Sequence, residues 1–183
     1  MAIKAESSSV VKKALKDEII KRPAEGTDKF FMNKAKESVK VANRLIELEA
    51  QEGLPSLLWV INASYYSMFF AATALLAKYD KKISTEIGVH RLTYHAIVHY
   101  FVIEDNKLEK RFIENYRDLI EDAEEILQLA ESKTEEFISS FHFEMSKRKK
   151  FTYNLGKNAE RQKAKTSLER AKEFVKVVQS FEL

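Results

Sequence analysis

Glycine, proline and cysteine are scarce in this sequence. The 183 residues include four glycines, two prolines and no cysteine, so glycine and proline make up about 3% of the chain, against roughly 12% in an average protein. This scarcity excludes all-β folds, which need turn residues every ~8–12 positions, and it excludes disordered and collagen-like chains. Without cysteine there is no disulfide, thiol catalysis or cysteine-based metal site, which suits a cytoplasmic protein.

A strong charge of either sign is also lacking. The chain has 31 Lys and Arg against 28 Asp and Glu, a formal net charge of +3, and the two signs are interspersed. So small an excess does not by itself indicate nucleic-acid binding. The first 22 residues carry lysines throughout and no continuous apolar run, so we expect no signal peptide there.

The one long stretch without charge runs from Gly53 to Ala77. Its 25 residues could span a bilayer as a helix that rises 1.5 Å per residue. However, Asn62 interrupts it, and Tyr65 and Tyr66 lie at its centre, where membrane-interface aromatics do not belong. A helix that is apolar on all sides is typical of the central helix of a soluble bundle. We therefore expect a buried helix and no membrane partner.

Elsewhere hydrophobic residues recur with the helical period. The spacing predicts helices over residues 7–21, 28–51, 55–79, 86–103, 107–149 and 158–181, and no strand of useful length. Asp28 is the expected N-cap of the second helix, and Ser84 or Thr85 that of the fourth. We expect Gly53 to end the second helix and Gly156 to lie in a loop before the last one.

These elements predict an all-α protein. We expect an up-and-down helical bundle of four to five core helices over residues 27–183, with an N-terminal helical extension over residues 1–26. The lysines of that extension could contact an anionic membrane surface. Because the extension is short, packing on the bundle or on a partner chain is the preferred interpretation.

Three of the four histidines, His90, His95 and His99, share one predicted helix. His95 and His99 are four residues apart and so lie on one face. Such a pair can hold a metal, but a site needs a third ligand, and the sequence has no HExxH motif here. Packing or surface histidines are the preferred interpretation, and we expect neither a metal nor another cofactor.

A cationic run precedes the last predicted helix. Four consecutive cations are followed closely by two aromatic residues: Lys147, Arg148, Lys149, Lys150, Phe151 and Tyr153. Cations beside aromatics suit phosphate binding with base stacking, so this segment is a candidate site for RNA or a nucleotide. A cationic run at the C-terminus of a helix also complements the helix dipole, which is the plainer interpretation.

Three motifs carry a resemblance that covers about residues 28–181. They are INASYYSMFFAATALL at 61–76, the His90–Arg91 pair with FV at 101–102, and RKKFTY at 148–153 followed by TSLERAKEFV at 166–175. Together they resemble the HEPN superfamily of small helical bundles, in particular the prokaryotic branch found beside minimal nucleotidyltransferases. The positions that carry the resemblance outside the RKKFTY box are Asn62, Tyr65, Tyr66, His90 and Arg91.

The resemblance implies a bundle that forms a homodimer. In toxin members of the family an Arg-x4–6-His motif cleaves RNA without a metal, with the histidine as general acid/base and the arginine on the phosphate. Arg148 is present here, but residues 152–154 are Thr, Tyr and Asn, and His142 lies six residues before the arginine. Tyrosine with an ordinary pKa near 10 cannot replace histidine as a base at pH 7. Loss of such help costs ~10²–10⁴ in rate.

We therefore expect a dimeric, cytoplasmic binding module. Its expected ligand is RNA or a nucleotide, or it pairs with a nucleotidyltransferase in a toxin–antitoxin-like system. One alternative is a metal-free endoribonuclease that uses Arg148 with His142 or Tyr153 as an unconventional acid/base. The other alternative is a purely structural interaction protein with the N-terminal helix as its docking element.

Overall fold

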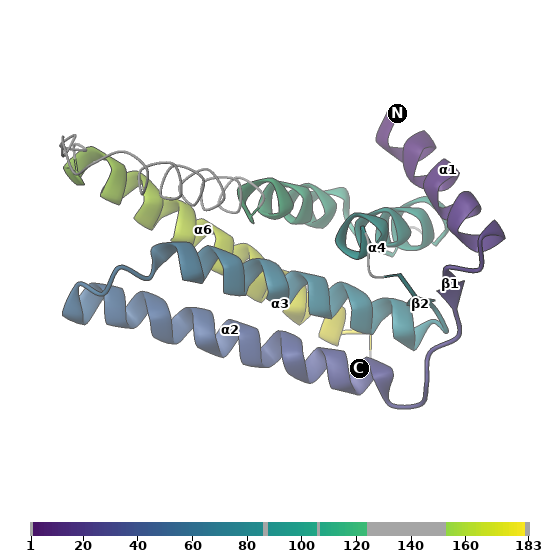
Figure 1. The fold of residues 1–183 in the computed structure, drawn as a ribbon, viewed down its shortest axis with the longest axis horizontal. Coiled ribbons are helices and arrows are strands. Elements are labelled where there is room, and N and C mark those ends of the chain that lie inside the picture. Colours follow the sequence, from purple (N-terminus) through teal and green to yellow (C-terminus); the bar gives the residue numbers. More distant parts are fainter. Residues whose placement is uncertain (1, 86–87, 106, 124–152, 182–183) are drawn as a thin grey trace, which may run out of the picture.

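Helices make up most of the fold. A computed structural model describes the chain except residues 1, 86–87, 106, 124–152 and 182–183 (Figure 1). In chain order the elements are α1 (Ala2–Lys16), β1 (Ile20–Lys21), α2 (Thr27–Glu52), α3 (Leu57–Lys78), β2 (Lys82–Ile83), α4 (Val89–Ile97), the π-helix η1 (Val98–Glu104), a helix over residues 110–123, and α6 (Tyr153–Gln179). The expected all-α helical bundle is confirmed.

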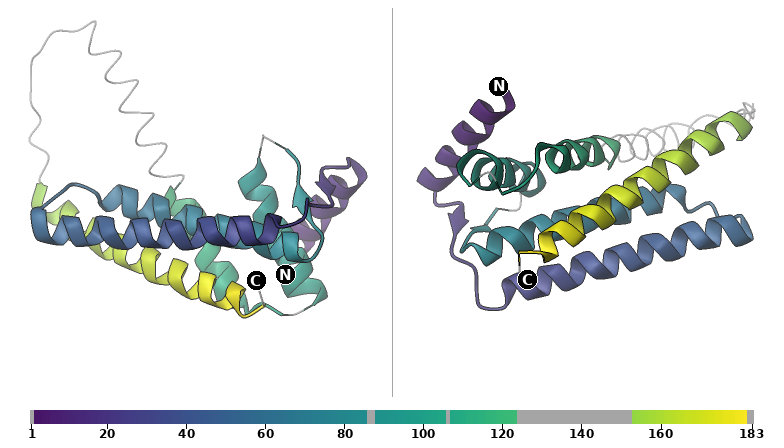
Figure 2. Two further views of the ribbon diagram at one scale, coloured as in Figure 1. Left: turned by 90° about the horizontal axis from the view of Figure 1, so that it is seen from below. Right: turned by 180° about the vertical axis from the view of Figure 1, so that it is seen from behind.

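Four helices alternate in direction along the bundle: α2, α3, residues 110–123 and α6 (Figures 1 and 2). α2 and α3 form an antiparallel pair with an extensive contact, and both helices bury alanines. Ser67 of α3 donates a hydrogen bond across this contact to the Ala35 carbonyl of α2 at 3.0 Å. α6 crosses α3 on the other side, so α3 is the central helix of the bundle.

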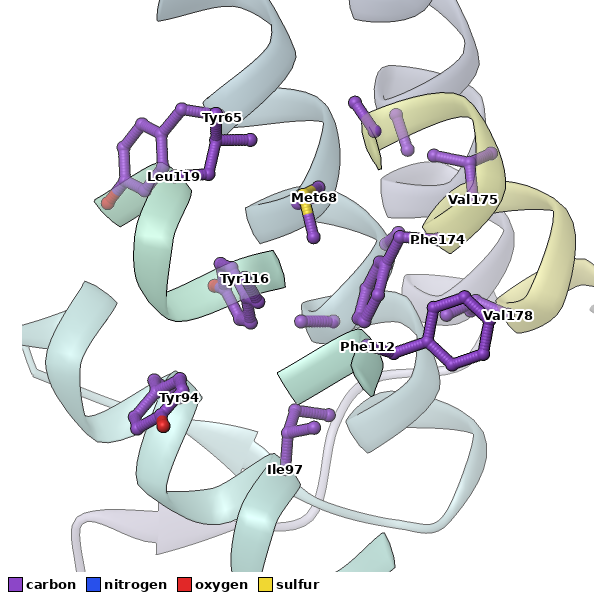
Figure 3. Packing of buried hydrophobic residues seen from close by; sticks show 14 of the residues in the cluster. Tyr65, Met68, Tyr94, Ile97, Phe112, Tyr116, Leu119, Phe174, Val175 and Val178 are labelled. Atoms are coloured by element: carbon purple, nitrogen blue, oxygen red, sulfur yellow. The ribbon is translucent and has the colours of Figure 1, made fainter. Parts of the chain in front are cut away.

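The core lies between α3, α4, residues 110–123 and α6 (Figure 3). Met68, Ile97, Tyr116 and Phe174 each come from a different one of these elements, and all four are fully buried. The rings of Tyr116 and Phe174 pack with centroids 5.6 Å apart. One continuous core therefore joins segments more than 100 residues apart in the chain.

Glycines with positive φ, not the expected side-chain caps, define several helix ends. Gly53 ends α2 as expected, with φ 67°, and its N–H donates to the Glu49 carbonyl at 3.0 Å. The prediction that Asp28 caps α2 is wrong, because Gly26 is the N-cap and Asp28 lies in the first turn. Gly88 likewise caps α4 in place of Ser84 or Thr85.

The N-terminal extension differs from its expected form. The first helix runs from Ala2 to Lys16 instead of 7–21, and Glu18 follows it with φ 53°. The chain then forms β1, which pairs antiparallel with β2 through Ile20 opposite Ile83 and Lys21 opposite Lys82. Two residues per strand are too few to leave an alternating pattern, so this small sheet depends on a contact between distant segments.

The fourth predicted helix is one continuous helical segment with a change of register. α4 leads directly into η1, so residues 89–104 are helical but the second part is wider. This register brings His99 and Glu104, five residues apart, onto one side, where Nε2 and Oε1 are 3.1 Å apart. Sequence periodicity alone predicted a regular helix here.

The last helix begins earlier than expected. α6 starts at Tyr153, so the prediction that Gly156 lies in a loop is wrong, because this glycine is in the first turn of the helix. Of the helix expected over 107–149, the part that the structure describes runs from residue 110 to 123. The remainder lies outside the described residues.

Candidate functional site

One side of α3 carries exposed and half-buried aromatic residues. Trp59 is 64% exposed and Tyr66 is 39% exposed. Ala63 lies between them, Phe70 follows Tyr66 one turn later, and both are half-buried. These residues follow one another at steps of four, three and four, so they form a straight stripe along the helix. We call these four residues the α3 stripe. In Figure 1, α6 passes behind α3 and none of the labelled helices covers the front of its middle turns.

The α3 stripe continues onto two neighbouring helices through ring contacts. Phe70 stacks on Phe31 of α2 with centroids 6.0 Å apart and planes at 28°. Tyr66 packs against Phe70 at 5.8 Å and against His90 of α4, also at 5.8 Å. The result is an aromatic surface built from three helices, and no charged residue of α3 lies between Leu57 and Ala77.

His90 fills the corner between α3 and α4. Its ring lies 4.1 Å from that of Phe69 and 5.4 Å from that of Tyr65, measured between centroids. Its Nδ1 is buried and has no hydrogen-bond partner among the residues described. Burial lowers the pKa of His90 below its ordinary value, so the imidazole is neutral at pH 7. His90 is therefore a packing residue that positions the aromatic surface.

Three of the residues that carry the family resemblance are in mutual contact. Tyr65 and Tyr66 of α3 both pack against His90, with the tyrosine ring centroids 5.4 Å apart. Asn62 lies one turn before Tyr66 on the same side of α3 and is half-buried. Arg91 is separate, since it points to α1 and forms an ion pair with Glu6 at 3.3 Å.

His95 and His99 lie at the contact between α1 and the bundle. Both are buried beneath α1, where each Nδ1 faces a serine hydroxyl, that of Ser7 or Ser8. Within the described ranges no group of three His, Cys, Asp or Glu side chains could hold a metal ion. The interpretation of these histidines as packing residues agrees with their burial.

The cationic run precedes α6 in the chain. Residues 147–151 and His142 lie outside the described residues, and of Tyr153 the structure gives only its position as the first residue of α6. Further along α6, Arg161 pairs with Glu49 of α2, and Arg170 pairs with Asp118 at 3.2 Å. These two α6 cations therefore form ion pairs between helices of the bundle.

α3 also meets the length and apolarity of a membrane-spanning helix. In its most apolar 18-residue window, however, 72% of the residues are buried inside the bundle, as in the core helix of a soluble protein. The expected buried helix agrees with this burial, and the α3 stripe is its exposed part.

Comparison with known proteins gives no match. No protein-family model matches the chain, and no curated protein or solved structure is significantly similar to it. Function must therefore be argued from the geometry of the aromatic surface and from the sequence.

Proposed function

We propose that this protein is a HEPN-like binding module that works as a cytoplasmic homodimer. The α3 stripe forms the contact between the two copies, and the dimer binds RNA or a nucleotide through the cationic run. One observation carries the dimer: an uncharged aromatic stripe remains exposed on the central helix of an otherwise charged protein. Exposed apolar patches of this kind mark interaction surfaces.

A second copy of the chain is the occupant that fits the stripe. Interface cores are enriched in Trp, Tyr and Phe and depleted in charge, which describes Trp59, Tyr66 and Phe70. A two-fold axis near Ala63 would set two α3 helices antiparallel, with Trp59 of one copy beside Tyr66 of the other. The small alanine at the axis would let the helices approach closely, and no buried charge would need a partner.

The dimer contact is tested by a Trp59→Lys, Tyr66→Lys double variant. Because each variant dimer would bring four lysines into an uncharged contact, we expect the dimer to weaken by about tenfold or more. Sedimentation velocity across micromolar concentrations measures the change, and circular dichroism checks that the bundle is intact. Leu15→Lys on α1 is the matched control, since Leu15 is 46% exposed but lies away from the stripe. A wild-type chain that remains monomeric would contradict the dimer.

The RNA interaction is tested at Arg148. We expect wild-type protein to bind a mixed RNA pool with an affinity that falls as salt rises, and Arg148→Ala to reduce the salt slope by about one. Arg44→Ala is the control, because Arg44 is an exposed α2 cation that pairs with Glu47. Equal and negligible binding by all three proteins would contradict the RNA branch. In that case a protein partner is preferred, for which the resemblance implies a nucleotidyltransferase.

A further inference from the structure

The N-terminal helix is attached to the bundle by histidines. Ser7 of α1 hydrogen-bonds to Nδ1 of His95 at 3.0 Å, and Ser8 hydrogen-bonds to Nδ1 of His99 at 3.3 Å. Ser7 is fully buried, and both histidines are nearly so. These contacts join residues 88 and 91 positions apart in the chain, so they exist only while α1 is docked.

Charged groups surround both imidazoles. Around His95, Glu6 of α1 places Oε1 at 3.8 Å from Nε2 and also pairs with Arg91 of α4. Around His99, Glu104 of η1 faces Nε2 at 3.1 Å, and Tyr100 packs ring against ring at 4.9 Å. The helix over residues 110–123 directs its own charges toward the neighbouring Tyr94: Glu114, Arg117 and Glu121.

The rest of the α1 contact is small. α1 packs mainly on α4 and η1, and Figure 1 shows it projecting from one end of the bundle, beyond the long helices. Among its side chains from Lys4 onward, which are the ones that the structure describes, those buried completely or nearly so besides Ser7 are Val11 and Ala14, which offer little apolar area. A free 15-residue helix is marginal in water, so an undocked α1 would also unfold.

We propose that α1 is an acid-released latch, in which protonation of His95 undocks the helix from α4 and η1 while the bundle stays folded. Release would uncover the sides of α4 and η1 that carry His95 and His99. The device depends on a titratable group placed in a small, mostly polar contact between a terminal helix and the bundle.

The surroundings of His95 determine whether a fall or a rise in pH releases α1. Burial, the largest influence, lowers the pKa of His95 below its ordinary value of 6.5; Glu6 opposes this change and Arg91 adds to it. The docked state therefore binds the proton more weakly than the undocked state does. Docking is then fully stable above pH 6.5 and weakens as the pH falls below that value.

Hydrogen–deuterium exchange of the full-length chain tests the latch. Exchange rates at pH 7.5 and 5.5 are divided by the intrinsic rate at each pH, and α1 peptides are compared with α3 peptides. We expect the normalised exchange of α1 to rise several-fold at pH 5.5 while that of α3 stays constant. Equal loosening of α1 and α3, or no change in α1, would overturn the proposal.

His95→Gln identifies the titrating group. Glutamine can still hydrogen-bond to Ser7 but does not titrate, so this variant should keep α1 protected at both pH values. His90→Gln is the control, because burial also lowers the pKa of His90 but its ring packs on α3. It should retain the acid release. A His95→Gln protein that still releases α1 in acid would refute the role of His95.

A second variant covers the case in which glutamine fails to dock. Glu6→Gln removes the carboxylate that favours charged His95, so the acid-induced rise in α1 exchange should become larger than in the wild type. An equal or smaller rise in Glu6→Gln would count against the latch.

Discussion

Replacing Phe174 with alanine is expected to lower the free energy of unfolding by about 3–5 kcal/mol, the range for large aromatic side chains removed from a core. Phe174 is fully buried on α6 and packs against Tyr116 (Figure 3). It connects the last helix with residues 110–123, so its removal would leave a cavity between these two helices. At roughly 2–4 °C per kcal/mol, the melting temperature should fall by about 6–20 °C.

Thermal and urea unfolding followed by circular dichroism measure this effect. Phe30→Ala is the matched control, since the same residue type is 56% exposed on α2 and its loss should change stability by about 0.5 kcal/mol or less. A Phe174→Ala protein with a stability within about 1 kcal/mol of the wild type would contradict the core packing.

Replacing Tyr116 with phenylalanine is expected to stabilise the protein. The hydroxyl of Tyr116 is buried and has no hydrogen-bond partner in the part of the chain that the structure describes. An unsatisfied buried polar group costs about 1–3 kcal/mol, and phenylalanine removes that cost while keeping the ring in place. Urea unfolding at pH 7 should therefore show a midpoint shifted upward with an unchanged slope.

The same substitution should flatten the alkaline limb of the stability profile. Burial raises the pKa of Tyr116 well above its ordinary value of 10, with a smaller contribution from Tyr65. The unfolded chain therefore loses this proton more readily than the folded one. The wild-type protein keeps its stability below pH 10 and loses stability as the pH rises above that value. Tyr116→Phe should lose less stability than the wild type over the same alkaline range.

Tyr94→Phe is the companion variant. The hydroxyl of Tyr94 is also buried without a partner among the described residues, and burial raises its pKa too. We expect Tyr94→Phe to raise the urea midpoint at pH 7 and to reduce the loss of stability above pH 10, as Tyr116→Phe does. A loss of stability in Tyr116→Phe at pH 7 would contradict the unsatisfied hydroxyl.

Helical period and glycine placement were sufficient to predict most of the fold. The predicted range 28–51 matched α2 to within one residue at each end, because apolar residues recur on one side of this helix and charged residues occupy the other. The same reasoning failed where distant segments decide the conformation. β1 exists because it meets β2, a contact that the local sequence does not contain. Gly156 lies within α6, although glycine is an unfavourable residue inside a helix.

The candidate site was only partly predictable. Tyr65, Tyr66 and His90 were named from a resemblance, and the structure places them in contact. Trp59 and Phe70 were missed, because a helix without charge gives no polar side by which the uncovered face can be recognised. Only packing shows which apolar side chains α2 and α6 leave exposed.

The wide turn of η1 lets one helical segment contact both α1 and the core of the bundle. An α-helix advances about 100° per residue, so an unbroken α-helix from Val89 to Glu104 would keep a single phase throughout. The π register changes the angle at which the later residues leave the helix. His95 and His99 lie under α1, while Phe101 lies in the core and packs against Tyr79 with ring centroids 5.0 Å apart. Loss of one residue between Val98 and Glu104 would restore the α phase and rotate one surface away from its neighbour. The number of residues in this segment is therefore constrained by the two contacts that the segment makes.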